Sequence, residues 1–142
     1  MVGIVTEPSL ALQTAIRSRL VSTPAVVALV EPAHIIEGPA RPSHFPSVIF
    51  GGGQTSLAGR AGTWRHVWVY LDLHVWTLEG GTEGARAIAN EIDRALVASL
   101  DVPGFLLIDG NLNVTGARFM RDPDEQHGHG IMSVAAFLGE TF

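Results

Sequence analysis

The strongest constraint on the fold is the stretch of residues 65–77, in which aliphatic side chains alternate with polar or aromatic ones. A period of two residues is typical of a β-strand, because successive side chains point to opposite faces of a sheet. The aliphatic face must lie in a core; it would carry Val67, Val69, Leu71, Leu73 and Val75. The other face mixes rings with polar groups, so we expect it to be half covered by a second layer or used as a contact surface; it would carry His66, Trp68, Tyr70, Asp72, His74 and Trp76.

Two helical patterns lie on either side of this strand in the chain. Apolar residues recur at helical spacing over residues 10–20 and again over residues 85–100. Either Thr6 or Glu7 would lie near the cap of the first helix, and the acidic Glu7 would complement the helix dipole. A short apolar helix is predicted over residues 25–30.

Further segments have the composition of strands, namely residues 34–37, 45–50, 105–108, 112–121 and 131–138. Because the strands cluster and do not alternate with helices, the pattern predicts an α+β fold with a mostly antiparallel (mixed) sheet and two main helices packed on one face. We expect a single domain over residues 1–142. Residues from about 51 to 64 are rich in Gly, Ser and Thr, and they predict a flexible loop.

Composition excludes several classes of protein. The 142 residues include no cysteine, and all nine basic residues are arginine, for a net charge of −5. Without cysteine there is no disulfide, thiolate metal site or Cys nucleophile, and without lysine there is no P-loop NTPase or Schiff-base enzyme. An acidic chain is a poor candidate for binding nucleic acid over its whole surface. No apolar stretch is long enough to span a membrane, so we expect a chain that folds in a cytoplasm.

The best candidate for chemistry is the pair His127 and His129 with Asp122 and Asp124. Two histidines at i and i+2 on an extended segment point the same way, and with nearby carboxylates they are possible ligands for zinc or another divalent ion. The alternative is a polar hairpin loop in which the aspartates fix the turn. We favour the hairpin, because the interspersed glycines do not preorganise a ligand set.

Two other patterns are weaker. Asp72 and His74 would be neighbours on one strand face and could form a hydrogen-bonded pair, but no G-x-S-x-G motif supplies a nucleophile. Pairing with polar groups of a neighbouring strand is the better interpretation. The run of glycines at residues 51–53 is not followed by a helix or a lysine, so it does not indicate a phosphate loop.

The aromatic residues Trp64, Trp68, Tyr70 and Trp76 offer three interpretations. They could stack nucleobases, as aromatic strands do in proteins that bind single strands, but basic residues are not interleaved with them. A protein–protein interface fits better, because Trp, Tyr and Arg are enriched at binding hot spots. A second buried layer under the helices is about as compatible with the pattern. No constellation points to an enzyme, and we expect no catalytic residue and no cofactor.

The chain resembles the tail-completion, or tail-terminator, family of long-tailed bacteriophages and gene transfer agents. The segments that carry the resemblance follow the family's order and cover nearly the whole chain. They are residues 9–13, 24–30, 45–50 (FPSVIF), 73–77 (LHVWT), 80–89 (GGTEGARAIA), 95–96, 121–124 (RDPD) and the closing strand after residues 127–128. The extended hairpin over residues 125–129 departs from the family's pattern.

The resemblance implies a structural role in a virion or gene transfer agent particle. Such proteins form a hexameric ring that caps the tail tube, stops its growth and joins the tail to the head connector. The implied partners are other copies of the chain, the tail tube protein and the connector or stopper protein. No catalytic residues are carried over. The candidate interface residues are Arg60, Trp64, Trp68, Tyr70, Trp76, Arg118, Arg121, Asp122 and Asp124.

A ring of this kind would let DNA pass without gripping it. Arginine contacts to phosphates bind strongly, so we expect a neutral or acidic lumen and expect most arginines to lie at subunit contacts. The alternatives are a head-side stopper of the same neck, a small metal-dependent enzyme using His127 and His129, and a module that binds single-stranded nucleic acid on the tryptophan strand.

Overall fold

The computed structural model describes residues 6–38, 41–57, 66–108 and 112–141. These described residues form three helices and six strands, with one 3₁₀ turn, η1. Their bounds are α1 Pro8–Val21, α2 Pro24–Val27, η1 Pro32–His34, β1 Ile35–Glu37, β2 Ser47–Leu57, β3 His66–Leu78, α3 Glu83–Ala95, β4 Phe105–Leu107, β5 Asn113–Arg121 and β6 His127–Glu140. No described helix is both long and apolar enough to cross a membrane.

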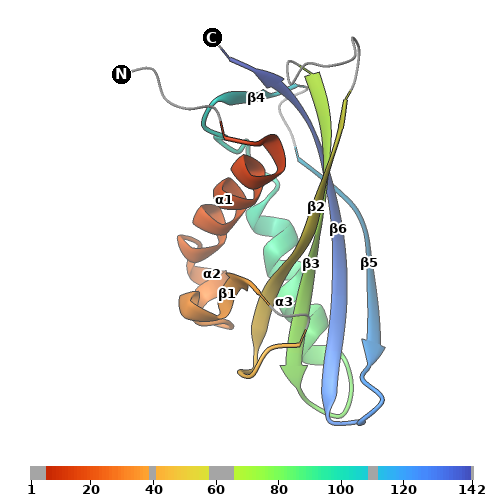
Figure 1. Cartoon of the computed structure of the whole chain (residues 1–142). Coiled ribbons are helices and arrows are strands. Elements are labelled where there is room, and N and C mark those ends of the chain that lie inside the picture. Colours follow the sequence, from red (N-terminus) through yellow and green to blue (C-terminus); the bar gives the residue numbers. More distant parts are fainter. Residues whose placement is uncertain (1–5, 39–40, 58–65, 109–111, 142) are drawn as a thin grey trace.

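The six strands form one mixed sheet with the order β1-β2-β3-β6-β4, and β5 pairs with β6 as well. Only β1 and β2 run parallel; the other pairs are antiparallel. The two long helices, α1 and α3, lie on the same face of this sheet (Figure 1). The predicted α+β class, with two main helices on one face, is confirmed.

The core lies between that helix layer and the sheet. The aliphatic residues of β3 are buried as predicted, from Val67 to Val75, and α1 and α3 each bury one stripe against them. Glu7 is the N-cap of α1, and its carboxylate accepts a hydrogen bond from the Leu10 N–H at 3.0 Å. Arg19 of α1 donates to the Ala95 carbonyl at the end of α3 at 2.7 Å, which ties the two helices together. Together these contacts fix the helix layer.

The predicted loop over residues 51–64 is wrong for its first half. Residues 51–57 continue β2, and Gln54 to Leu57 pair with Tyr70 to Val67 of β3. The register shifts between Phe50 and Gly53, where two glycines oppose one residue of β3. Gly53 also lies under the start of α1, where a Cβ would be 2.9 Å from the Ser9 Cβ. The glycines therefore form a β-bulge in a strand that packs closely against a helix. Residues 58–64 lie outside the described part.

Other boundaries also differ from the sequence prediction. The last strand begins at His127 and not at Ile131. Its two glycines belong to the strand because neighbouring side chains come too close for a larger residue: a Cβ would lie under 3.0 Å from Thr77 at Gly128 and from Phe119 at Gly130. The second main helix ends at Ala95, although the apolar pattern continues to the buried Leu100. The helix predicted over residues 25–30 is α2, which ends at Val27.

Candidate functional site: the open face of the sheet

The face of the sheet opposite α1 and α3, which we call the open face, is covered by no described helix (Figure 1). Alternation along β3 and β6 places one set of side chains on it. From one end of the sheet to the other they form an aromatic cluster, a histidine pair and a charged cluster. The paired rows are His66 with Gly139, Trp68 with Phe137, Tyr70 with Ala135, Asp72 with Ser133, His74 with Ile131, Trp76 with His129, and Leu78 with His127.

The aromatic cluster lies at one end of β3. Trp68 stacks on Phe137 with a ring-centroid distance of 4.9 Å and lies 6.4 Å from Tyr70. His66 lies 6.1 Å from Phe137. Tyr70 is 43% exposed, so the cluster presents ring surface to solvent. Such a rigid aromatic patch is the kind of surface that partner proteins cover.

The middle of the open face is polar and paired within the chain. Ser133 donates to the Asp72 carboxylate at 2.8 Å, and His74 Nδ1 lies 2.9 Å from His129 Nε2. Asp72 and His74 therefore pair with the neighbouring strand and not with each other, which supports the cross-strand interpretation. Partial burial lowers the pKa of both histidines. The negative charge of Asp72 acts against this lowering at His74, whereas His74 lowers the pKa of His129 further.

Trp76 is buried, with 5% of its surface exposed. His129 stacks on its ring at 3.9 Å, Phe45 meets it edge-on at 6.5 Å, and the Arg41 guanidinium lies 5.6 Å from its centroid. Trp76 is therefore enclosed by its own chain, whereas Trp68 is only half-buried. Its Nε1 has no hydrogen-bond partner among the described residues.

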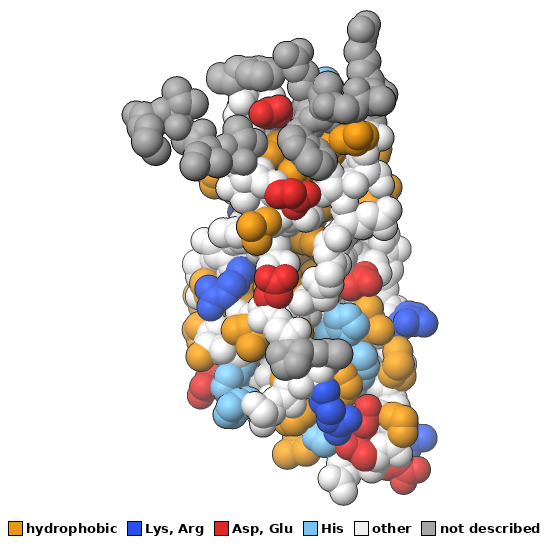
Figure 2. Space-filling model, in the orientation of Figure 1, with side chains coloured by type: hydrophobic (Ala, Val, Ile, Leu, Met, Phe, Trp, Pro, Cys, Tyr) orange, Lys and Arg blue, Asp and Glu red, His pale blue; other side chains and the backbone are white. Residues whose placement is uncertain are grey.

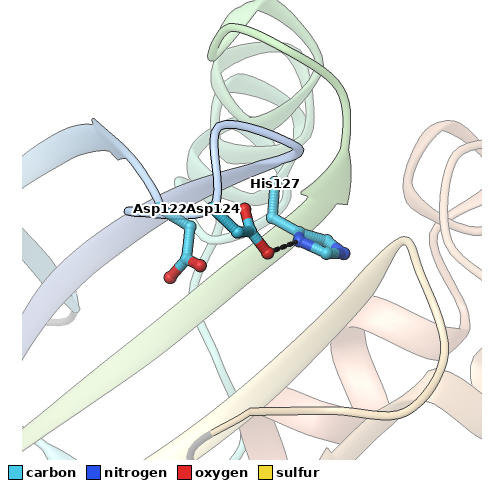
Figure 3. Close-up of side chains that lie close together, drawn as sticks. All are labelled: Asp122, Asp124 and His127. Carbon is cyan, nitrogen blue, oxygen red and sulfur yellow. Dashed lines mark hydrogen bonds and ion pairs between the residues drawn. The ribbon is translucent and has the colours of Figure 1, made fainter.

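The charged cluster lies at the turn between β5 and β6, where side chains of both charges gather (Figure 2). Asp122, Asp124 and His127 lie close together there, and the Asp124 carboxylate points toward the His127 ring (Figure 3). Arg41 donates to Asp122 at 2.8 Å and to Asp124 at 2.6 Å, and these bonds raise the pKa of Arg41. His127 Nδ1 lies 2.6 Å from Asp124 Oδ2. The Gln126 N–H, with smaller contributions from Arg41 and His127, lowers the pKa of Asp124 well below its usual range.

Of the four predicted metal-ligand candidates, the structure brings three together. Asp122, Asp124 and His127 have ligand atoms within 4.8 Å of one another, whereas His129 belongs to the Trp76 stack. The two carboxylates already bind the guanidinium of Arg41, a cation supplied by the chain itself. This arrangement favours the hairpin interpretation, since the aspartates fix the turn and hold a distant loop against it.

The remaining predicted interface residues are spread over the molecule. Arg118 is exposed on β5, and Arg121 is exposed at its end. Arg60 and Trp64 lie outside the described residues. Several arginines bind groups of their own chain, and this leaves fewer of them for the predicted subunit contacts. They are Arg17, Arg19, Arg41 and Arg86.

Sequence reasoning missed Arg41 and Phe45, which complete the charged cluster and the Trp76 packing. They lie in a proline-rich segment with no periodic pattern, so no sequence signal links them to a turn some eighty residues later. Phe137 was also missed, although strict alternation along the last strand places it beside Trp68.

Comparison with known protein families identifies one match. The family model described as "Tail completion protein gp17" matches residues 14–139. The chain belongs to the tail completion protein gp17 family. It is therefore a structural tail protein that is located in a phage-like virion.

A solved structure supports the fold of this tail completion protein. A chain from the "Virion of native gene transfer agent (GTA) particle" superimposes with a TM-score of 0.76 at 22% sequence identity. The match covers 90% of this chain and 94% of that one, so the two share essentially the whole fold. No curated protein matches the chain.

Proposed function

We propose that six copies of this protein form a ring at the head-proximal end of a phage-like tail. The ring stops growth of the tail tube and joins the tail to the connector of the head. The observation that carries this proposal is the family match over residues 14–139, which spans nearly the whole chain. The partners are then neighbouring copies, the tail tube protein and the connector protein.

The surface of the chain is compatible with assembly. A ring closed by rotation uses two different patches on each subunit in heterologous contact. The open face offers an exposed aromatic cluster around Trp68 and Tyr70, and the sheet has two separate edges. The single chain thus presents several distinct surfaces for partners.

The proposed role needs no catalysis. The carboxylates of Asp122 and Asp124 are bound by Arg41, and His74 and His129 bind each other, so these groups serve the fold. In the ring, DNA passes through the lumen without specific binding. Purified protein should therefore bind an oligonucleotide weakly at physiological salt, because a chain with a net charge of −5 neutralises few phosphates and so releases few of their counterions.

Electron microscopy of particles that lack this protein tests the proposal. We expect tails of uncontrolled length or tails detached from heads, and restoration of normal particles when the wild-type chain is supplied. Tails of normal length with heads that lose their DNA would instead favour a head-side stopper. Normal particles would contradict both roles.

The ring itself is tested by light scattering after size-exclusion chromatography and by averaging particle images at the neck. A mass of six chains, or six-fold symmetric density at the tube end, is the expected result. A monomer in solution that is also absent from the neck would contradict the ring.

A further inference from the structure

The sheet has two edges without a strand partner among the described residues. On one side, β1 pairs only with Val48 to Phe50, so residues 51–57 of β2 have an uncovered outer edge. On the other side, β5 pairs with β6 through its inner edge alone, along Asn113–Arg121. Free strand edges present unpaired N–H and C=O groups that can bind another strand.

These edges carry little of the usual edge protection beyond the glycine bulge of β2 and the two arginines of β5. Neither residues 51–57 nor β5 contain proline, and residues 51–57 carry no charge. The bulge of β5 lies near its start, between Val114 and Gly116, and pairing is regular from Ala117 to Arg121. The regular stretches, residues 54–57 of β2 and 117–121 of β5, leave unpaired backbone groups that are a liability for a monomer, and a partner strand would cover them.

The directions of the two edges are complementary. The strands alternate in direction from β2 through β3 and β6 to β5, so β5 runs antiparallel to β2. Rotation about a ring axis preserves the sense of strands that run along the axis. The β5 edge of one copy therefore meets the β2 edge of the next in antiparallel orientation.

The helix layer offers complementary apolar surfaces at the same two edges: a groove at one edge and exposed leucines at the other. A groove of about 350 Å³ separates α3 from β5, and its apolar lining includes Val114, Ala117 and Phe119. At the opposite edge, Leu10 and Leu57 are 48% and 47% exposed. Gln13 of α1 bonds to Glu37 of β1, and Leu10 lies one turn before Gln13 on the same side of the helix. Leu10 therefore faces the β2 edge. Thr55 of β2 bonds to Glu7 at 2.6 Å, which holds this end of α1 over residues 51–57.

We infer that β5 of one subunit pairs with residues 51–57 of β2 in the next, and that Leu10 and Leu57 of that neighbour pack into the groove beside β5. The inference rests on the proposed ring, and it names the contact that closes the ring. Six sheets then join edge to edge into one continuous sheet. The free edges and the apolar groove are both covered by copies of the same chain.

A proline substitution tests the strand pairing. The backbone N–H of Asp122 donates to the His127 carbonyl at 2.8 Å, and bonded pairs alternate along an antiparallel ladder, so the N–H of Ala117 points away from β6. Proline is tolerated at such an edge position in the subunit but cannot donate to an added strand. We expect Ala117→Pro to raise the concentration needed for ring assembly at least tenfold, whereas Ala117→Ser, which keeps the N–H, assembles like wild type.

The absence of cysteine allows a direct test by cross-linking. Arg118 and Gln54 lie on the open face of their respective edge strands, as does Ser56. Variants that combine Arg118→Cys with either Gln54→Cys or Ser56→Cys should form disulfide-linked ladders up to six chains under mild oxidation. A variant with Arg118→Cys and Ala87→Cys, at an exposed position of α3 that does not line the groove, should not.

The apolar half of the contact is tested by Leu10→Glu, which should weaken assembly at least tenfold. The matched control is Val97→Glu, an exposed position just after α3 and near the Arg19 contact, away from both edges. Circular dichroism and thermal unfolding of each variant confirm that the subunit still folds.

The outcomes separate the two proposals. If wild type forms rings, but Ala117→Pro assembles normally and no specific ladder appears, the edge pairing is wrong and the ring stands. If wild type forms no ring in solution or at the neck of particles, the ring and the edge pairing both fail. A ladder in the Arg118→Cys pairs together with loss of assembly in Ala117→Pro is the result expected.

Discussion

The two faces of β3 differ in what stabilises them. On the helix side, Leu73 is fully buried with its aliphatic neighbours between the sheet and the helices. On the open face, Tyr70 is 43% exposed, and Asp72 and His74 are held by polar partners on β6. One strand therefore serves the core on one side and carries a half-exposed aromatic and polar surface on the other. The comparison implies that stability and assembly can be perturbed separately by side chains two or three residues apart.

The largest expected effect is in the core. Replacing Leu73 with Ala removes fully buried methyl groups and leaves a cavity, so we expect the free energy of unfolding to fall by about 2–5 kcal/mol. Tyr70→Ala removes a half-exposed ring that stacks on Trp68, and we expect a loss below about 1 kcal/mol. Urea unfolding of the monomeric chain measures both. Equal losses would mean that the open face is buried in the isolated subunit.

The next effect concerns backbone packing on the helix side of β6. A Cβ at Gly128 would lie 2.6 Å from Thr77 Oγ1 and 2.7 Å from the Gly81 carbonyl, whereas a Cβ at Gly116 on β5 meets nothing within 4 Å. We expect Gly128→Ala to cost about 1–3 kcal/mol through overpacking, and Gly116→Ala to be nearly neutral. Thermal unfolding of the two variants distinguishes them, and a neutral Gly128→Ala would show that the turn after β3 moves freely.

A smaller difference in the free energy of unfolding is expected between variants of two carboxylates, Glu79 and Asp72. Glu79, on the helix side, accepts hydrogen bonds from the N–H groups of Gly84 and Ala85 at 2.9 and 3.0 Å and so caps α3. Its burial raises the pKa, but these bonds and the Thr77 hydroxyl lower it overall. We expect Glu79→Gln to cost about 1 kcal/mol, as loss of a helix cap does, and Asp72→Asn to cost less. Urea unfolding at pH 7.5 measures the difference, and the reverse order would contradict the division of roles.

The sequence predicts the covered side of the molecule well and the open side poorly, for a physical reason. Burial requires apolar side chains at a fixed period, so the core of β3 and the stripe of α3 can be identified from local pattern alone. Pairing across strands leaves no such local signal. The bond between Arg41 and Asp122 joins segments distant in the chain, and the contact between His74 and His129 depends on the register of β3 with β6.

Glycine misled the prediction in two places. The runs at residues 51–53 and 128–130 indicate loops when considered alone, because glycine weakens strands. In the fold, Gly53 and Gly128 lie where a helix start or a turn passes too close for a Cβ, so the strands β2 and β6 run through them. The close approach of another segment becomes visible only in three dimensions.

The smallest predicted effect tests whether the histidine pair of the open face is sheltered from water. Burial lowers the pKa of His74 and His129 from their ordinary 6.5, so the unfolded chain takes up protons at a higher pH than the folded one. Stability is therefore full above about pH 6.5 and falls as the pH drops below it. His129→Phe keeps a ring on Trp76 without a titrating group, so the free energy of unfolding should depend less on pH between 7 and 5.

Asp72→Asn should have the opposite effect on this dependence. The negative charge of Asp72 favours the protonated form of His74, and removing it lowers the pKa of His74 further. The loss of stability between pH 7 and 5 should then be larger than in wild type, in unfolding curves recorded at matched ionic strength. If wild type loses no stability over this range, the two histidines are as hydrated in the fold as in the unfolded chain. The contrast between the two faces would then extend to the middle of the open face, which would be a fully solvated surface available to partners.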